Sequence, residues 1–181
     1  MNVSSHLYKS VTAAVCISLC VILPFAFHMI PNGGTLFSPM HLPVLFCGIV
    51  CGPWYGLLCG LFGPILSCIL TGMPGVGYLT IMMTELAVYG FISGMVMRFL
   101  HTGKQITDIY ISLLAAMIFG RILAGIAQAL LFAPDEYTMA IWATSYFVSC
   151  FPAILMQLIL IPILYVALQK ARLLSHLTSG S

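Results

Sequence analysis

The chain has 181 residues, of which 61% are hydrophobic and only 6% are charged. Soluble domains average about 25% charged residues, so this composition excludes a water-covered surface and predicts an all-α integral membrane protein. The formal net charge of +2 gives no indication of a nucleic-acid partner.

Breaks at glycine, proline and charged residues divide the chain into six apolar runs, and a membrane-crossing helix needs about 20 such residues. We therefore predict one transmembrane domain, residues 1–181, built as a six-helix bundle with a loose tail at about 174–181. The first run is read as a retained helix, because no small-residue cleavage site follows it. The predicted helices are residues 9–27, 40–51, 55–70, 77–100, 108–132 and 139–170.

The second and third runs are short, and the corner at Gly52, Pro53 and Trp54 predicts that they form a hairpin. The alternative is a single long bent helix with interfacial ends. Three connections on the opposite side, at residues 25–39, 71–77 and 133–137, are rich in proline, glycine or polar residues. Such segments are often functional lids, although each is also consistent with a plain connection.

Basic residues predict the orientation of the bundle. They stand at the start of the first run, around the connection between the fourth and fifth, and after the sixth, whereas the opposite connections have neither Lys nor Arg. Cytoplasmic loops carry an excess of these residues, so we expect both termini in the cytoplasm. The five basic residues are Lys9, Arg98, Lys104, Lys170 and Arg172.

Small residues recur at four-residue spacing, a pattern that lets helix backbones approach closely in lipid. Most of these stripes predict internal packing, and they comprise Gly52, Gly56, Gly60 and Gly63, then Gly90 and Gly94, then Ala116 and Gly120. In the first run, Ala14 and Ser18 form a similar pair. That pair could instead face another protein in the membrane.

Glu85 and Arg121 are the two charged side chains that fall well inside predicted spans. A charge near the bilayer centre costs about 2.5–3.5 kcal/mol on insertion scales, so such residues usually pair or face a polar cavity. At about 1.5 Å rise per residue, they lie roughly 12 and 16 Å below the outer ends of their helices. They could form a structural salt bridge, or contact a ligand at the floor of a cavity.

Further polar and aromatic residues gather in the same outer half. Asn32 and His41 flank the first outer loop, and the later runs contribute Tyr89, Gln128, Trp142 and Tyr146. Aromatic walls with a few fixed polar groups suit a small ring-bearing or amide-bearing ligand. Trp142 is also consistent with the interfacial aromatic belt. His28 and His41 lack a third ligand at suitable spacing, so no metal site is predicted.

Several motifs are absent from the sequence. No Walker A motif, H-E-x-x-H or G-x-S-x-G occurs, and the seven cysteines contain no C-x-x-C pair. No relay of acidic or histidine residues threads the spans. These absences argue against an enzyme, a resident cofactor and a self-powered pump. A small ligand-binding bundle of this kind would need a downhill gradient or an energised partner.

The order of elements resembles the substrate-binding S-components of energy-coupling factor (ECF) vitamin transporters. The most specific stretch reads PMHLPVLFCGIVCGPWYGLLCGLFGPILSCILTG, and MMTELAVYGFISG follows it. The resemblance implies a six-helix bundle in a bacterial plasma membrane, which binds a vitamin near its outer face beneath the first outer loop. It also implies docking on a membrane T-component driven by two cytoplasmic ATPases, with Ala14 and Ser18 as the docking face.

The branch of the family that the sequence resembles suggests pantothenate or a cobalamin-precursor nucleoside such as α-ribazole. Arg121 would suit the carboxylate of pantothenate, unless Glu85 already neutralises it. Trp142 or Tyr146 would suit a stacked benzimidazole. Two other hypotheses stay open, namely a polytopic membrane scaffold with no ligand, and a membrane enzyme that uses Glu85 and a histidine.

Overall fold

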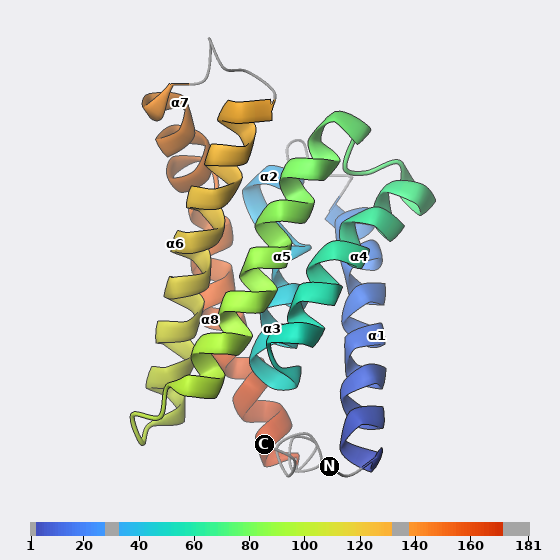
Figure 1. Ribbon diagram of the computed structural model, residues 1–181, viewed down its shortest axis with the longest axis vertical. Coiled ribbons are helices and arrows are strands. Elements are labelled where there is room, and N and C mark those ends of the chain that lie inside the picture. The colour runs from blue at the N-terminus through green and yellow to red at the C-terminus, as the bar shows by residue number, and fades with distance from the viewer. Residues whose placement is uncertain (1–2, 28–32, 132–137, 172–181) are drawn as a thin grey trace.

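A computed structural model describes residues 3–27, 33–131 and 138–171 of the chain. Asn32, the third outer connection at 133–137 and the tail at 174–181 lie outside these described residues. The described part is helical throughout, apart from short connections (Figure 1). In chain order the helices are α1 (Val3–Phe27), α2 (Gly33–Phe37), α3 (His41–Cys51), α4 (Pro53–Thr71), α5 (Val76–Phe99), α6 (Gln105–Leu131), α7 (Met139–Ala143), the π-helix η1 (Thr144–Val148) and α8 (Phe151–Lys170).

Five of these helices, α1, α4, α5, α6 and α8, are long and apolar enough to cross a membrane. This confirms the prediction of a helical membrane bundle. The second predicted run corresponds to α3, which has only 11 residues. At about 1.5 Å per residue, α3 is shorter than the roughly 30 Å hydrocarbon core of a bilayer.

The second and third predicted runs are separate helices that pack against each other, as the hairpin interpretation requires. Gly52 connects them with φ 100°, a backbone conformation that is strained for residues with a Cβ. Pro53 then begins α4, where its missing N–H removes no helical hydrogen bond. The alternative of one long bent helix is therefore wrong.

The prediction of one continuous helix at 139–170 is also wrong. The segment divides into α7, η1 and α8, and the amide of Ser149 donates to the carbonyl of Thr144 at 2.9 Å, a π-type bond five residues back. Pro152 lies in the first turn of α8. Because proline has no N–H, it cannot continue the preceding hydrogen-bond ladder, and it favours a new helix start.

Glycines bring the backbones of α3, α4 and α5 into direct contact where these helices meet. A Cβ on Gly56 would overlap the carbonyl oxygen of Gly90, and a Cβ on Gly90 would overlap that of Gly56. Gly60 lies equally close to the carbonyl of Leu86. The predicted packing role of these small residues is confirmed, because only glycine allows such backbone contact.

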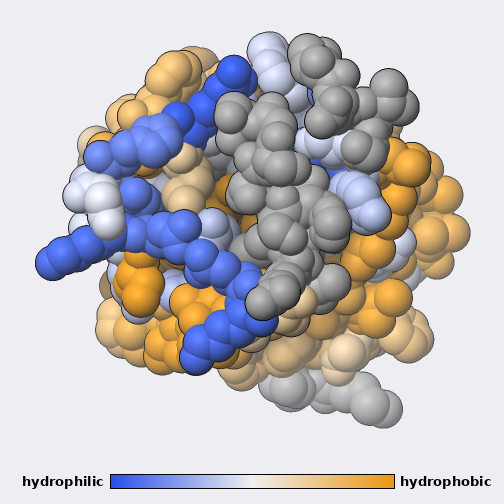
Figure 2. Space-filling view, turned by 90° about the horizontal axis from the view of Figure 1, so that it is seen from below, coloured by the Kyte–Doolittle hydropathy of each residue, from blue (hydrophilic) through white to orange (hydrophobic). Residues whose placement is uncertain are grey.

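The first residues of α1 and the last residues of α8 lie at the same lower end of the bundle, together with the α5–α6 connection (Figure 1). Arg98, Lys104 and Lys170 are exposed at the helix ends there. Hydrophilic side chains gather on this lower face, as Figure 2 shows. The predicted outer half therefore corresponds to the upper end in Figure 1.

Candidate ligand-binding site

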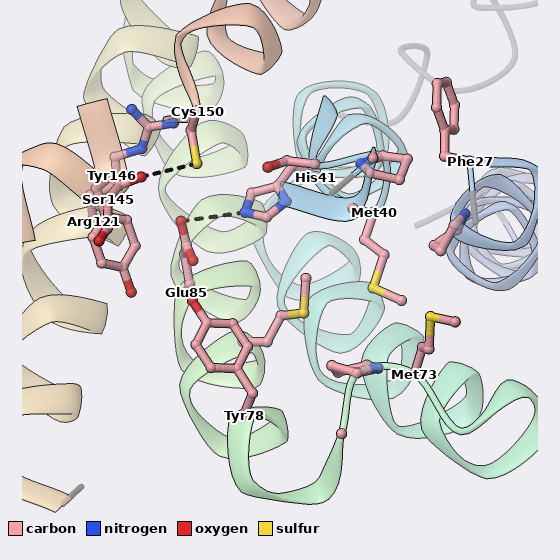
Figure 3. A pocket seen from close by; sticks show the side chains of 18 of the residues that line it. Phe27, Met40, His41, Met73, Tyr78, Glu85, Arg121, Ser145, Tyr146 and Cys150 are labelled. Atoms are coloured by element: carbon pink, nitrogen blue, oxygen red, sulfur yellow. Dashed lines mark hydrogen bonds and ion pairs between the residues drawn. The ribbon is translucent and has the colours of Figure 1, made fainter. Parts of the chain in front are cut away.

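A cavity of about 710 Å³ opens in the upper half of the bundle (Figure 3). Its wall comes from the end of α1, from α2 and the start of α3, from the α4–α5 connection, and from α5, α6 and η1. Ligand pockets typically measure about 300–1,000 Å³ and combine an apolar lining with a few polar groups. The lining residues are Pro24, Phe27, Gly33, Gly34, Ser38, Pro39, Met40, His41, Met73, Pro74, Gly75, Tyr78, Met82, Glu85, Arg121, Gln128, Ser145, Tyr146 and Cys150.

Glu85 on α5 pairs with His41, the first residue of α3. Nε2 of His41 lies 3.3 Å from Oε1 of Glu85, and each side chain is 7% exposed. The His41 ring also contacts Tyr89 edge-on, with centroids 5.1 Å apart. Among the described residues, the basic side chain close to the Glu85 carboxylate is that of His41, so the predicted salt bridge to Arg121 is not observed. The sequence placed His41 near the site but did not reveal its partner.

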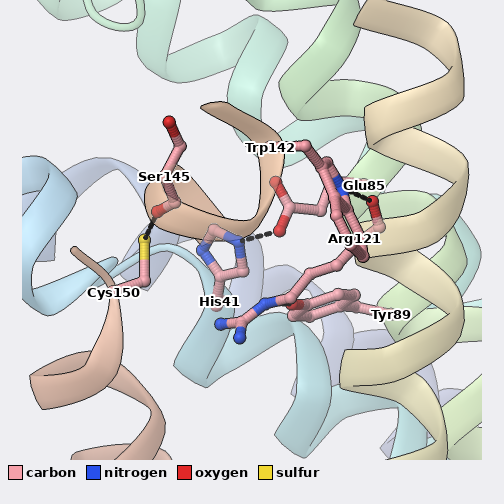
Figure 4. A network of polar contacts seen from close by, with 7 residues as sticks. All are labelled: His41, Glu85, Tyr89, Arg121, Trp142, Ser145 and Cys150. Atoms are coloured by element: carbon pink, nitrogen blue, oxygen red, sulfur yellow. Dashed lines mark hydrogen bonds and ion pairs between the residues drawn. The ribbon is translucent and has the colours of Figure 1, made fainter. Parts of the chain in front are cut away.

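Arg121 on α6 is 4% exposed and is held by its own contacts (Figure 4). Its Nε donates to the hydroxyl oxygen of Tyr89 at 2.9 Å, and its guanidinium carbon lies 5.3 Å from the centroid of the Phe147 ring. The indole Nε1 of Trp142 donates to the backbone carbonyl of Arg121 at 3.1 Å. Both the backbone and the side chain of Arg121 are thus fixed by aromatic residues.

Two glycines of α6 make room for these aromatic rings. A Cβ on Gly120 would overlap the Tyr89 ring, and a Cβ on Gly125 would overlap the indole of Trp142. The small-residue pattern at Ala116 and Gly120 therefore has a consequence for the site. It lets the Tyr89 ring lie directly against α6, where its hydroxyl reaches the guanidinium.

The π-helical turn η1 brings the C-terminal part of the chain onto the cavity. Ser145 and Tyr146 line it from η1, and Cys150 lines it from the residue just before α8. The Cys150 thiol donates to the carbonyl of Ser145 at 3.3 Å. Single π turns occur frequently at functional sites. The sequence did not reveal this turn, because it has no signature beyond the proline that follows.

The predicted site residues divide into three groups. Lining residues are His41, Glu85, Arg121, Gln128 and Tyr146. Tyr89 and Trp142 do not line the cavity but contact Arg121, and Asn32 lies outside the described residues.

Three methionines that were not predicted as site residues also line the cavity. They are Met40, Met73 and Met82. Methionine is common in apolar helices, so its presence does not distinguish a cavity wall from a core. Of the three, Met73 lies in the connection at 71–77, which the sequence left open as a functional lid or a plain connection.

The predicted partner face on α1 is exposed. Ala14 and Ser18 are both on the outer side of the helix, whereas Ala13, Cys16 and Cys20 are buried against the bundle. The Ser18 hydroxyl donates to the carbonyl of Ala14 at 3.0 Å, so its hydrogen-bonding capacity is partly met within the helix. Within the described ranges, no cluster of three or more His, Cys, Asp or Glu side chains could hold a metal ion.

These features define a multi-pass membrane protein with a ligand-sized cavity near one end. Residues 9–179 match the family model described as ECF transporter, substrate-specific component, and the chain belongs to this family. The family consists of transporter substrate-binding subunits rather than enzymes, and membership implies interaction with a T-component, with ATPases and with a small-molecule substrate. Searches of curated proteins and of solved structures found no significant match.

Proposed function

We propose that this chain captures a water-soluble vitamin or vitamin precursor in its 710 Å³ cavity, for import across a bacterial plasma membrane. The observation that carries the proposal is the cavity itself, which His41, Glu85, Arg121 and Gln128 line together with apolar residues. Such a lining is typical of small-molecule sites. Transport would be driven by two cytoplasmic ATPases through a membrane T-component.

Pantothenate and α-ribazole are the leading ligands. Arg121 supports pantothenate, because a guanidinium matches a carboxylate. Tyr146 and Tyr78 line the cavity, and their aromatic rings would support a benzimidazole nucleoside. Trp142 does not line this cavity, so the stacking role that the sequence suggested for it loses support.

The scaffold alternative predicts a filled outer half and a salt bridge between Glu85 and Arg121. The cavity beside both residues, and the pairing of Glu85 with His41, favour ligand capture instead. Native mass spectrometry of the detergent-purified protein tests this choice. A co-purified small molecule is the expected result, whereas no bound molecule and no thermal shift across a vitamin panel would support the scaffold.

For the topology, we propose six crossings with both termini in the cytoplasm. The common lower end of α1 and α8 supports an even number of passes (Figure 1), in which α2 and α3 together make the second. Basic residues at that end support its cytoplasmic placement. Cysteine-accessibility labelling tests the orientation, since the thiol in His101→Cys, at an exposed position, should react only from the cytoplasmic side.

For the partner face, Ala14 and Ser18 are proposed to contact the T-component. Their small side chains would let a partner helix approach closely, and both are exposed on α1. Ala14→Leu with Ser18→Leu should reduce co-purification with the T-component while the isolated chain stays folded. Ala167→Leu, at an exposed position on α8, is the matched control. An intact complex in the double variant would overturn the docking proposal.

A further inference from the structure

Arg121 is the cation in the cavity wall that has no carboxylate partner among the described residues. Glu85 is engaged by His41, and Asp108 lies at the opposite end of the bundle, where the amide and hydroxyl of Thr102 donate to it. Arg121 nevertheless is 4% exposed and lies within a membrane-spanning helix. A buried charge is costly unless it is paired, so a compensating group is needed.

The contacts of Arg121 leave one edge of the guanidinium for that group. Nε is occupied by the Tyr89 hydroxyl, and one face lies against Phe147. The described residues supply no hydrogen-bond acceptor for the two terminal amino groups, and the side chain lines the cavity. Figure 4 shows these amino groups pointing away from the Tyr89 ring, toward the side on which Cys150 lies.

The remaining edge has a defined chemical preference. Two parallel N–H groups in a planar fork match the two oxygens of a carboxylate, and such charge-assisted pairs are short and strong. One guanidinium compensates one negative charge. A dianionic phosphate would leave excess negative charge beside Glu85, which lines the same cavity, so a monoanion fits this site better.

We propose that the transported molecule carries a single carboxylate, which the terminal amino groups of Arg121 bind end-on. The inference rests on the proposed function and names the substrate class of the same cavity. Tyr89 and Phe147 act as positioning residues, because they fix the guanidinium before the ligand arrives. The proposal favours pantothenate, which has one carboxylate, over α-ribazole, which is an uncharged nucleoside.

Paired probes that differ only at the charged group test the proposal. Pantothenate has a carboxylate where pantothenol has a hydroxymethyl group, and nicotinate has a carboxylate where nicotinamide has an amide. Affinities of the purified full chain for these four compounds and for α-ribazole can be measured by isothermal titration calorimetry. We expect one carboxylate compound to bind at least about 100-fold more tightly than its neutral partner, which corresponds to roughly 2.8 kcal/mol.

Variants of Arg121 separate charge from geometry. Arg121→Gln should lower the affinity for the carboxylate compound to about that of the neutral partner. Arg121→Lys should recover part of the preference, because it restores the charge but not the fork. Arg98→Gln removes the same charge at an exposed position outside the cavity and is the control. Size-exclusion profiles in detergent show whether each variant folds.

The outcomes distinguish this inference from the proposed function. Tight binding of α-ribazole, pantothenol or nicotinamide that equals or exceeds carboxylate binding would overturn the carboxylate inference and leave ligand capture standing. A carboxylate preference that survives in folded Arg121→Gln would also overturn it. No binding of any probe, together with no co-purified molecule in native mass spectrometry, would overturn both proposals. If an Arg121 variant fails to fold, the affinities of the wild-type chain for the paired probes still test the carboxylate inference.

Discussion

The α3–α4–α5 region and the wall of the cavity are built from different kinds of contact. In the first, backbone lies directly on backbone, since a Cβ on Gly56, Gly60 or Gly90 would overlap a carbonyl group of the facing helix. In the second, the surface comes from side chains on short elements, including α2, the α4–α5 connection and η1. A Cβ on Gly34 or Gly75, by contrast, would meet no atom within 4 Å.

We call the glycine-mediated contact of α3, α4 and α5 the frame, and the lining of the cavity the wall. The frame is held by backbone contacts, whereas the wall is made of side chains that can adjust. Glu85 and Tyr89 project from α5, which the glycine contacts hold in one position. Met40 and Met73 line the cavity from outside the long helices, whereas Met82 lines it from α5 itself. The unbranched side chains of these methionines can adjust to a ligand. Ligand anchors on rigid elements are more precise than anchors on loops. Substitutions in each region should therefore have different effects on stability and on ligand binding.

The largest effect is expected from Gly90→Ala. The new methyl group would overlap the carbonyl of Gly56, and two backbones cannot yield as a flexible side chain can. Overpacking typically costs about 1–3 kcal/mol, and we expect at least about 3 kcal/mol here. Thermal unfolding in detergent measures the loss. Gly77→Ala, where a Cβ has no neighbour within 4 Å, should be nearly neutral, and equal melting temperatures would refute the role assigned to Gly90.

The next largest effect is expected from Gly120→Ala, which should change both the stability of the bundle and its affinity for ligand. The added Cβ would displace the Tyr89 ring, which is fully buried and whose hydroxyl oxygen accepts a hydrogen bond from Nε of Arg121. We expect a loss of about 2 kcal/mol in stability. A drop of about tenfold or more in ligand affinity should accompany it, because the guanidinium loses its support. Calorimetry with the co-purified ligand measures this, and undiminished affinity in a folded variant would contradict it.

The sequence predicted the frame far better than the wall. Five of the six apolar runs fell on α1, α3, α4, α5 and α6, because long apolar stretches bounded by glycine, proline and charge leave few alternatives in a membrane. The four-residue glycine spacing also predicted close packing, since it places small residues on one helix face. The spacing did not indicate which neighbouring helix each row of small residues would pack against.

The wall was less predictable, because its contacts are not periodic. The pairing of His41 with Glu85 joins two helices, and nothing in either helix specifies the other. The depths of Glu85 and Arg121 were predicted to be similar, but similar depth does not establish contact. The π turn at Thr144–Val148 inserts one extra residue into a helical pattern, which composition alone does not reveal.

A smaller effect is expected from Glu85→Gln, which tests whether the contact between Glu85 and His41 stabilises the bundle. The amide keeps an oxygen that can accept from His41 but removes the charge. Since hydrogen bonds to charged groups are worth about 1.5–3 kcal/mol and neutral ones about 1 kcal/mol, we expect a loss of about 1 kcal/mol in thermal unfolding. Glu85→Ala removes the acceptor as well and should cost more. Equal losses would show that the pair contributes little.

The smallest effect is expected from Thr138→Ala, at the start of α7, which precedes η1 and does not line the cavity. The Thr138 hydroxyl accepts from the amide of Ile141 at 3.3 Å and caps α7, and losing such a cap costs about 0.5–2 kcal/mol. Because α7 has only five residues and none of them is buried, the loss should appear as faster amide exchange at Ile141 and not as lower global melting. Thr138→Ser keeps the hydroxyl and should retain protection. A lowered melting temperature in Thr138→Ala would mean that α7 belongs to the rigid frame, because only a segment that unfolds together with the core transmits a local loss to the whole bundle.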